Sequence, residues 1–164
     1  MTSQLKMLNL IHLLLSKQGV CDFKKILKLL YFIDFEHFYL YDKSITGEVY
    51  YNLPHGPVPT KSYRTLFDEG QKQGLFTIVD PFHLSVCSNY QSNISMFGKL
   101  EQNTVENILT KYGHLTGNQL EAISHIDIPY VLTELQEVIE YEYVKYRDSE
   151  ITESEDITEL VLNA

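Results

Sequence analysis

The chain has 164 residues and a net charge of −9, and 44% of its residues are hydrophobic. This length suits one domain with a substantial core, because two independent cores would each be small. No uncharged apolar stretch reaches the roughly 20 residues of a membrane-spanning helix, and the two cysteines are too few for a disulfide framework or a cysteine-rich zinc site.

Charge is divided unequally between the two halves of the chain. Residues 1–75 carry nine Lys or Arg against seven acidic residues, a net charge of +2, whereas residues 76–164 carry four against fifteen, a net charge of −11. An acidic surface repels a phosphate backbone, so we expect no direct binding of nucleic acid. The same surface favours a basic protein partner.

Two adjacent apolar stripes near the start of the chain predict an amphipathic helix from about Ser3 to Ser16. Its most apolar part, Leu8 to Leu15, is comparable with the apolar core of a signal peptide. The sequence around it lacks the basic segment and the small-residue cleavage site of such a peptide. We therefore expect a cytoplasmic protein whose first helix is part of the domain.

The segment from Asp22 to Tyr41 is the centre of the predicted fold. The apolar run from Leu29 to Ile33 fits a buried strand as well, but the pattern continues for about twenty residues without Gly or Pro, which favours a helix. Its apolar side chains cover nearly every direction around the helix axis. We therefore expect a buried central helix over about residues 22–41, with Asp22 as its N-cap.

Three polar residues interrupt this apolar run, namely Lys28, Asp34 and His37. A buried charge is costly unless it is paired, so each of them needs a partner. Asp34 and His37 are three residues apart and are expected to be neighbours on one helical face. The three side chains fit either a buried structural arrangement, which we favour, or a catalytic acid–base group.

The segment after the central helix predicts a turn, a strand and a stiff loop. Gly47 marks the turn, and the alternating apolar residues of 49–53 predict a short strand. Residues 54–59, PHGPVP, follow. Because proline fixes φ and removes a donor, we expect no regular element here. Such a loop is preorganised to meet another chain, and its prolines would hold His55 away from the core.

The rest of the chain predicts further helices and a small sheet. Helices are expected at residues 61–73, 101–112, after Thr116 and from Pro129 towards Tyr143, and short strands at residues 75–79, 82–86 and 93–97. The predicted fold is therefore α+β, a mostly helical single domain around the central helix with a small antiparallel β-element.

The composition changes after Arg147. We divide the chain into a domain of residues 1–147 and an acidic C-terminal arm of residues 148–164, which cannot form a core alone. The arm is either mobile or an interaction segment. In the second case Ile157, Leu160 and Val161 would form a short apolar face on a partner.

The sequence contains no Gly-rich phosphate loop, no G-x-S-x-G elbow and no H-E-x-x-H pair. Its histidines are far apart, so we expect no metal site and no cofactor, and a nucleophile built from Cys87, His55 and Asp34 has no better support. An enzyme that uses Asp34, His37 and His55 remains an alternative. Structural or interface histidines are favoured over it.

Four ordered blocks of sequence resemble those of a known family. They are KLLYFIDFEHF (28–38), SITG (44–47), PHGPVP (54–59) and KYGHLTGNQLEAISH followed by PY (111–130). In order and spacing they resemble the Panacea domain, the SocA-like antitoxin domain that is also found in phage-associated proteins. The resemblance covers about residues 5–145.

This resemblance implies an antitoxin of a toxin–antitoxin system, which neutralises a cognate protein toxin by direct binding. From the residues themselves we expect no catalytic residue and no membrane or direct nucleic-acid partner. An alternative is an adaptor that delivers the bound protein to a protease, with a protease or chaperone as a further partner and the arm as its flexible element. The matching motifs place the structural signature and the toxin-contact region on two sets of residues: Lys28, Tyr31, Asp34, His37, Gly47 and His125 for the first, and His55, Gly56, Pro57, Val58 and Pro59 for the second.

Overall fold

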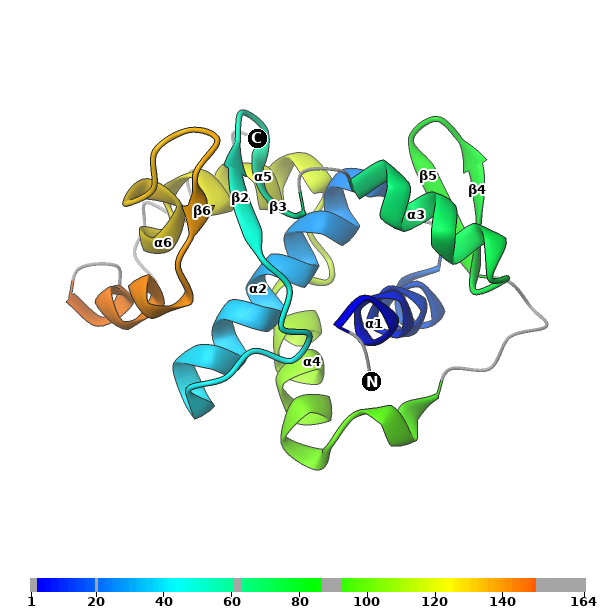
Figure 1. Ribbon diagram of the computed structural model, residues 1–164, viewed down its shortest axis with the longest axis horizontal. Helices are drawn as coiled ribbons and strands as arrows, with labels where there is room; N and C mark the ends of the chain where they lie inside the picture. The colour runs from blue at the N-terminus through cyan, green and yellow to red at the C-terminus, as the bar shows by residue number, and fades with distance from the viewer. Residues whose placement is uncertain (1–2, 20, 61–62, 87–92, 150–164) are drawn as a thin grey trace.

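The computed structural model describes residues 3–19, 21–60, 63–86 and 93–149, and the other elements surround one long central helix (Figure 1). No helix in this described part is long and apolar enough to cross a membrane. The elements in chain order are α1 (Ser3–Gln18), β1 (Cys21–Asp22), α2 (Phe23–Tyr41), β2 (Tyr50–Leu53), β3 (Gly56–Pro59), α3 (Tyr63–Lys72), β4 (Phe76–Asp80), β5 (His83–Val86), the 3-10 helix η1 (Ile94–Met96), α4 (Lys99–Tyr112), α5 (Gly117–Ile126), α6 (Ile128–Val131), β6 (Val138–Ile139) and the 3-10 helix η2 (Tyr141–Ser149).

Helix α2 is the buried central helix that the sequence predicts. Asp22 caps it, because its Oδ1 accepts a hydrogen bond of 2.6 Å from the backbone N–H of Lys25. The helix ends at Asp42, which adopts a left-handed conformation with φ of 59°. Every residue from Ile26 to Phe35 is buried, so neighbours surround this part of the helix on all sides.

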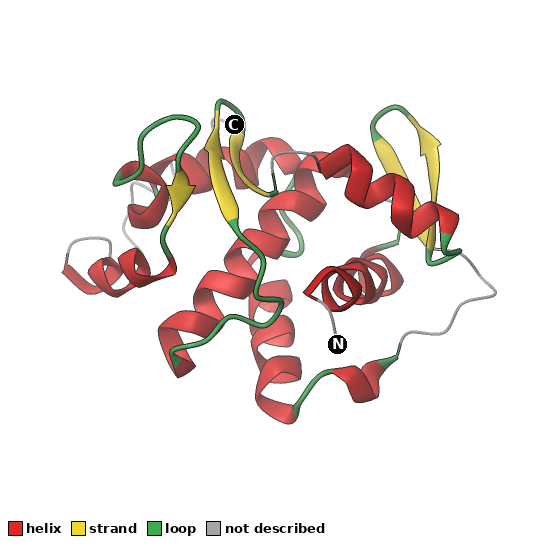
Figure 2. Ribbon diagram, in the orientation of Figure 1, coloured by secondary structure: helices red, strands yellow, loops and turns green. Residues whose placement is uncertain are grey.

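Two small antiparallel sheets lie at different places around α2 (Figure 2). One has the strand order β1-β5-β4, and the other has the order β3-β2-β6. Together with the helices they confirm the α+β, mostly helical fold class. The predicted strand at residues 93–97 is wrong, since η1 occupies this place. Its local bonds explain the difference: Met96 N donates to Asn93 O, and the Ser95 hydroxyl donates to Asn93 Oδ1.

The prediction that no regular element passes through residues 54–59 is also wrong, because strand β3 begins at Gly56. Its pairing with β2 explains why two prolines are tolerated. Pro57 and Pro59 lie opposite Asn52 and Tyr50, while Thr60 N donates to Val49 O. Alternate residues of a strand point their N–H groups to opposite sides, so both prolines stand where the N–H would point away from β2. The outer edge of β3 therefore has carbonyl groups but no N–H donor.

The predicted last helix, from Pro129 towards Tyr143, ends after one turn. The side-chain Nδ2 of Asn52 donates to the carbonyl oxygens of Tyr130 and Thr133, at 3.2 Å and 2.7 Å, and Gln136 N donates to Asn52 O at 2.7 Å. These bonds direct the chain into β6 instead of a longer helix. Leu135, which lies within the predicted helix, is consequently 56% exposed. Residues 150–164 of the predicted arm lie outside the described residues.

The SITG turn of residues 44–47 is fixed to α2 by one buried carboxylate. Asp34 accepts four hydrogen bonds: from the N–H groups of Ile45 and Thr46 at 2.9 Å each, from the Thr46 hydroxyl at 2.6 Å and from the Tyr50 hydroxyl at 2.7 Å. Burial raises the pKa of the Asp34 carboxyl, while these four donors act in the opposite direction. The Gly47 N–H donates to Ser44 Oγ and completes the turn.

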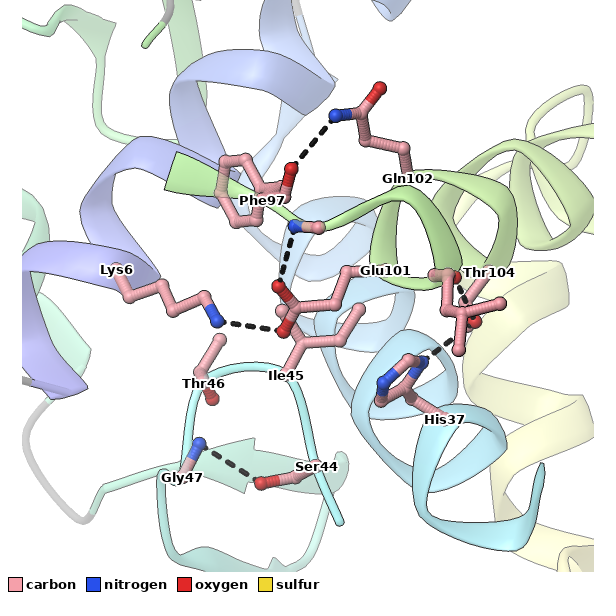
Figure 3. Close-up of polar contacts among 12 residues, drawn as sticks. Lys6, His37, Ser44, Ile45, Thr46, Gly47, Phe97, Glu101, Gln102 and Thr104 are labelled. Carbon is pink, nitrogen blue, oxygen red and sulfur yellow. Dashed lines mark hydrogen bonds and ion pairs between the residues drawn. The ribbon is translucent and has the colours of Figure 1, made fainter. Parts of the chain in front are cut away.

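His37, one turn further along α2, holds a different element. Its Nδ1 lies 2.8 Å from Thr104 Oγ1 on α4, as Figure 3 shows. The Thr104 hydroxyl also lies 3.1 Å from Leu100 O, so it bridges the His37 ring and the first turn of α4. Near it, Glu101 accepts from Gly98 N and from Lys6 Nζ, which joins α1 to the start of α4. Asp34 and His37 thus serve separate contacts.

We predict that Asp34→Ala lowers the free energy of unfolding by about 3 kcal/mol, because it leaves four buried or half-buried donors without their acceptor. Urea unfolding followed by far-UV circular dichroism measures this change. Glu36→Ala on the same helix is the control. Glu36 is 3.5 Å from Arg147 and partly exposed, so its loss should cost less than about 1 kcal/mol. Equal losses in both variants would contradict the central role of Asp34.

Candidate partner-binding groove

A groove of about 580 Å³ opens beside the N-terminal end of α2. Five segments line it: the start of α2, the β2–β3 turn with part of β3, the start of α3, the β4–β5 turn and the start of α5. Phe23, Leu27, Val58 and Phe82 form much of its apolar wall. A volume of roughly 300–1,000 Å³ with apolar walls and a few polar groups is typical of binding sites.

Lys28 lies on the floor of this groove and is almost completely buried. Its Nζ donates a hydrogen bond of 3.0 Å to the carbonyl oxygen of Pro57. The lysine thus supplies the outer edge of β3 with a hydrogen-bond donor that would otherwise come from a neighbouring strand. Burial lowers the pKa of Lys28 to about 7, although the nearby carboxylate of Glu121 opposes this shift.

Close packing of the β2–β3 turn on Lys28 requires glycine at position 56. A Cβ atom there would lie 2.6 Å from Lys28 Cε and 2.8 Å from Ser124 Oγ, and the φ of Gly56 is +105°. Any other side chain would therefore push the turn away from α2 and α5. Gly56 sets how deep the groove is at this point.

A small polar cluster forms one rim of the groove. His55 Nδ1 lies 2.9 Å from Oε1 of Glu121, and Lys24 Nζ lies 2.7 Å from Oε2 of the same carboxylate. Lys24 also donates to Asn118 Oδ1 at 3.0 Å. The His55 side chain is 83% exposed, so it projects from the rim as the sequence predicts. Lys24 and His55 together lower the pKa of Glu121 against the effect of its partial burial.

The carboxylate of Asp22 is held between two helix N-termini at the end of the groove. It caps α2, and a Cβ atom at Gly117, the first residue of α5, would lie only 2.6 Å from Asp22 Oδ1. The positive ends of two helix dipoles therefore compensate its charge. Thr116 caps α5 by accepting from Gln119 N at 3.2 Å, which fixes the start of this helix.

The opposite rim combines aromatic rings with an arginine. The guanidinium group of Arg64 stands 5.9 Å from the ring centre of Phe23 and 5.8 Å from that of Tyr63. Phe82 is 69% exposed although its backbone carbonyl accepts from Phe23 N at 2.9 Å. This large apolar side chain is therefore presented to solvent by a fixed backbone.

The structure places the predicted contact residues unequally. His55 is exposed, Gly56 and Val58 line the groove, and Pro57 and Pro59 are buried in β3 outside the groove lining. No sequence pattern indicates Phe23, Arg64 or Phe82 as groove residues, because their segments are far apart along the chain. Phe82 could have been noticed only as an aromatic residue next to the Asp80-Pro81 turn.

The predicted structural-signature residues do not converge on one site. Lys28 reaches β3, and the Tyr31 hydroxyl donates to Asp127 Oδ2 at 2.5 Å, where Arg147 also binds. Asp34, His37 and Gly47 belong to the contacts described above, and the His125 ring stacks on Tyr130 with centroids 5.1 Å apart. Asp34 and Gly47 share the turn before β2, and each of the other members contacts a different part of the fold.

The candidate catalytic and metal-binding residues are also not joined to one another in the described part of the structure. Among the described residues, no hydrogen bond or ion pair joins any two of Asp34, His37 and His55. No group of three or more His, Cys, Asp or Glu in the described part is placed to hold a metal ion. Cys21 is buried, which raises the pKa of its thiol, and Cys87 lies outside the described residues.

The buried amine of Lys28 predicts a particular pH dependence of stability. Its pKa in the folded protein, about 7, is below the value of about 10.4 for an unfolded chain, so the unfolded state binds more protons between these values. We expect the stability of the wild type relative to Lys28→Met to rise between pH 7 and 10, by at most about 1.4 kcal/mol per pH unit. Urea unfolding across this range measures it.

The control for this experiment is Lys17→Met, which removes an exposed surface amine paired with Glu106. This variant retains Lys28 and should follow the pH dependence of the wild type. Parallel stability curves for the wild type and Lys28→Met would show that the buried amine does not titrate in this range.

The comparisons with known proteins agree with the motif-based resemblance. The family described as "Antitoxin SocA-like, Panacea domain" matches residues 26–128 of the chain. Neither the curated proteins nor the solved structures contain a significant match. The matched segment covers more than half of the chain. It includes all groove residues of four of the five lining segments, and Leu27 and Lys28 of the fifth. The chain belongs to the SocA-like antitoxin family with a Panacea domain.

Proposed function

We propose that this protein is an antitoxin that neutralises a cognate protein toxin by binding it directly, and that the groove is the contact surface. Membership of the SocA-like antitoxin family is the observation that carries the proposal. The groove supports it, because its lining from Leu27 onwards belongs to the family-matched segment.

The shape and exposure of the groove residues favour a protein ligand. A few aromatic or arginine side chains usually supply most of the binding energy of a protein interface. Phe82, Tyr63 and Arg64 are of these types and lie together at one rim, while His55 projects at the other. Tyr63 and Arg64 belong to α3, and His55 and Phe82 lie in the short turns of two paired hairpins, so little conformational entropy is lost when a partner binds.

The proposal requires binding but no catalysis by this chain. Asp34 and His37 are buried and committed to contacts that hold α2 to its neighbours, and His55 is bonded to Glu121 at the surface. None of them has the shared geometry that an acid–base mechanism needs. Neutralisation by occlusion of the toxin uses only the surface that these contacts hold in place.

Co-expression with the product of the neighbouring gene tests this function. We expect that product alone to stop growth and this protein to restore it. Phe82→Ala should weaken toxin binding about 30-fold, which corresponds to about 2 kcal/mol for an aromatic hot spot. Val79→Ala is the matched control, because Val79 is 51% exposed on the same hairpin but does not line the groove. Isothermal titration calorimetry with a catalytically inactive toxin measures both.

Growth arrest that is equal with and without this protein would contradict an antitoxin function. Equal losses of toxin affinity in Phe82→Ala and Val79→Ala would be compatible with an antitoxin function but would place the contact surface outside the groove.

Deletion of residues 150–164 separates occlusion from delivery to a protease. Occlusion predicts unchanged protection, whereas an adaptor would still bind the toxin but no longer promote its degradation.

A further inference from the structure

We propose that the groove recognises a polypeptide segment of its partner in which a large apolar side chain stands next to a carboxylate. The apolar side chain would pack against Phe23 and Phe82, and the carboxylate would pair with Arg64 at the rim, close to Lys28 on the floor. This inference rests on the proposed function and specifies the chemistry of the toxin segment.

The first step of the argument concerns how a partner can bind next to β3. An extended peptide often adds a strand to an exposed sheet edge and uses the N–H and C=O groups of that edge. The outer edge of β3 has proline at positions 57 and 59, and Lys28 already occupies the carbonyl of Pro57. Strand addition is therefore unfavourable here. Recognition has to use side chains in the groove.

The second step concerns charge. Within the described residues, no carboxylate forms an ion pair with Arg64 or Lys28. An ammonium group has three donors, and one of those of Lys28 is used by Pro57. Lys24 differs, since Glu121 and Asn118 already accept from it. Arg64 thus leaves a local positive charge in a chain whose net charge is −9, and Lys28, whose pKa is about 7, adds part of a charge at neutral pH.

The third step concerns the acidic residue of the groove itself. Asp22 lines the groove, but its carboxylate is bonded to Lys25 N and packed against the first residue of α5. Two helix N-termini therefore compensate its charge, and it does not neutralise Arg64. A partner carboxylate is complementary to the remaining charge, and charge complementarity of this kind determines specificity and association rate.

The fourth step concerns the apolar part of the segment. Phe82 is 69% exposed and lines the groove together with Phe23, Leu27 and Val58. A large aliphatic or aromatic side chain that covers this apolar surface stabilises the complex, because apolar area is removed from water. The guanidinium of Arg64 lies near the Phe23 ring, so an apolar side chain and an adjacent carboxylate can be bound at the same time.

A test that does not depend on the toxin uses a library of random 12-residue peptides displayed on phage and selected on the full chain. We expect the selected peptides to share a large apolar residue next to Asp or Glu. A synthetic peptide of this sequence and its Asn or Gln counterpart are then titrated into the wild type and into Arg64→Gln. Arg64 is exposed, so this variant should fold, which circular dichroism verifies.

The expected result is a tenfold loss of affinity from carboxylate to amide in the wild type and less than a twofold loss in Arg64→Gln. Phe82→Ala should weaken both peptides. A library that yields no binder, or only neutral or basic sequences, overturns the inference, and so does an amide effect that is equal in the wild type and Arg64→Gln. If such a result is obtained while the protein still neutralises the toxin in the growth assay, the proposed recognition of a carboxylate-containing segment is refuted. The antitoxin function is then retained.

Discussion

The fold depends on four buried polar side chains that recur at every third position of α2. Lys28, Tyr31, Asp34 and His37 each bond to a different part of the later chain: β3, Asp127 at the start of α6, the turn before β2, and α4. Three residues fall about 60° short of a full helical turn, so successive members point in successively rotated directions. One helix can therefore hold elements on several of its sides, and each bond satisfies a group that would be costly to bury alone.

The groove is formed at the end of α2 where this series begins. Lys28 draws the edge of β3 onto the helix, and Asp22 fixes the start of α5 beside it. The groove thus lies between segments that the buried bonds position, and its exposed residues need no structural role of their own. This division explains why the four polar residues of α2 are buried while Phe82, Arg64 and His55 are exposed.

Local patterns were sufficient to predict α2, because its length and its apolar surroundings are encoded within twenty consecutive residues. They were insufficient wherever a distant side chain decides the outcome. Asn52 ends the last helix early by binding two of its carbonyls, and the pairing with β2 makes a strand of a proline-rich segment. The spacing of Asp34 and His37 suggested a mutual contact, yet each has a distant partner. The groove could not be predicted, since no local pattern brings residues 23, 64 and 82 together.

The two prolines of β3 have a consequence for the protein in a crowded cell. A chain that carries an apolar groove beside the edge strand of a small sheet is at risk of aggregation if that edge opens, because edge strands of different copies can join into extended sheets. With proline at positions 57 and 59 the edge offers no N–H group to another copy, and the Lys28 amine covers one of its carbonyls. The groove is the surface best suited to bind another protein, and the β3 edge beside it is in this way protected from self-association.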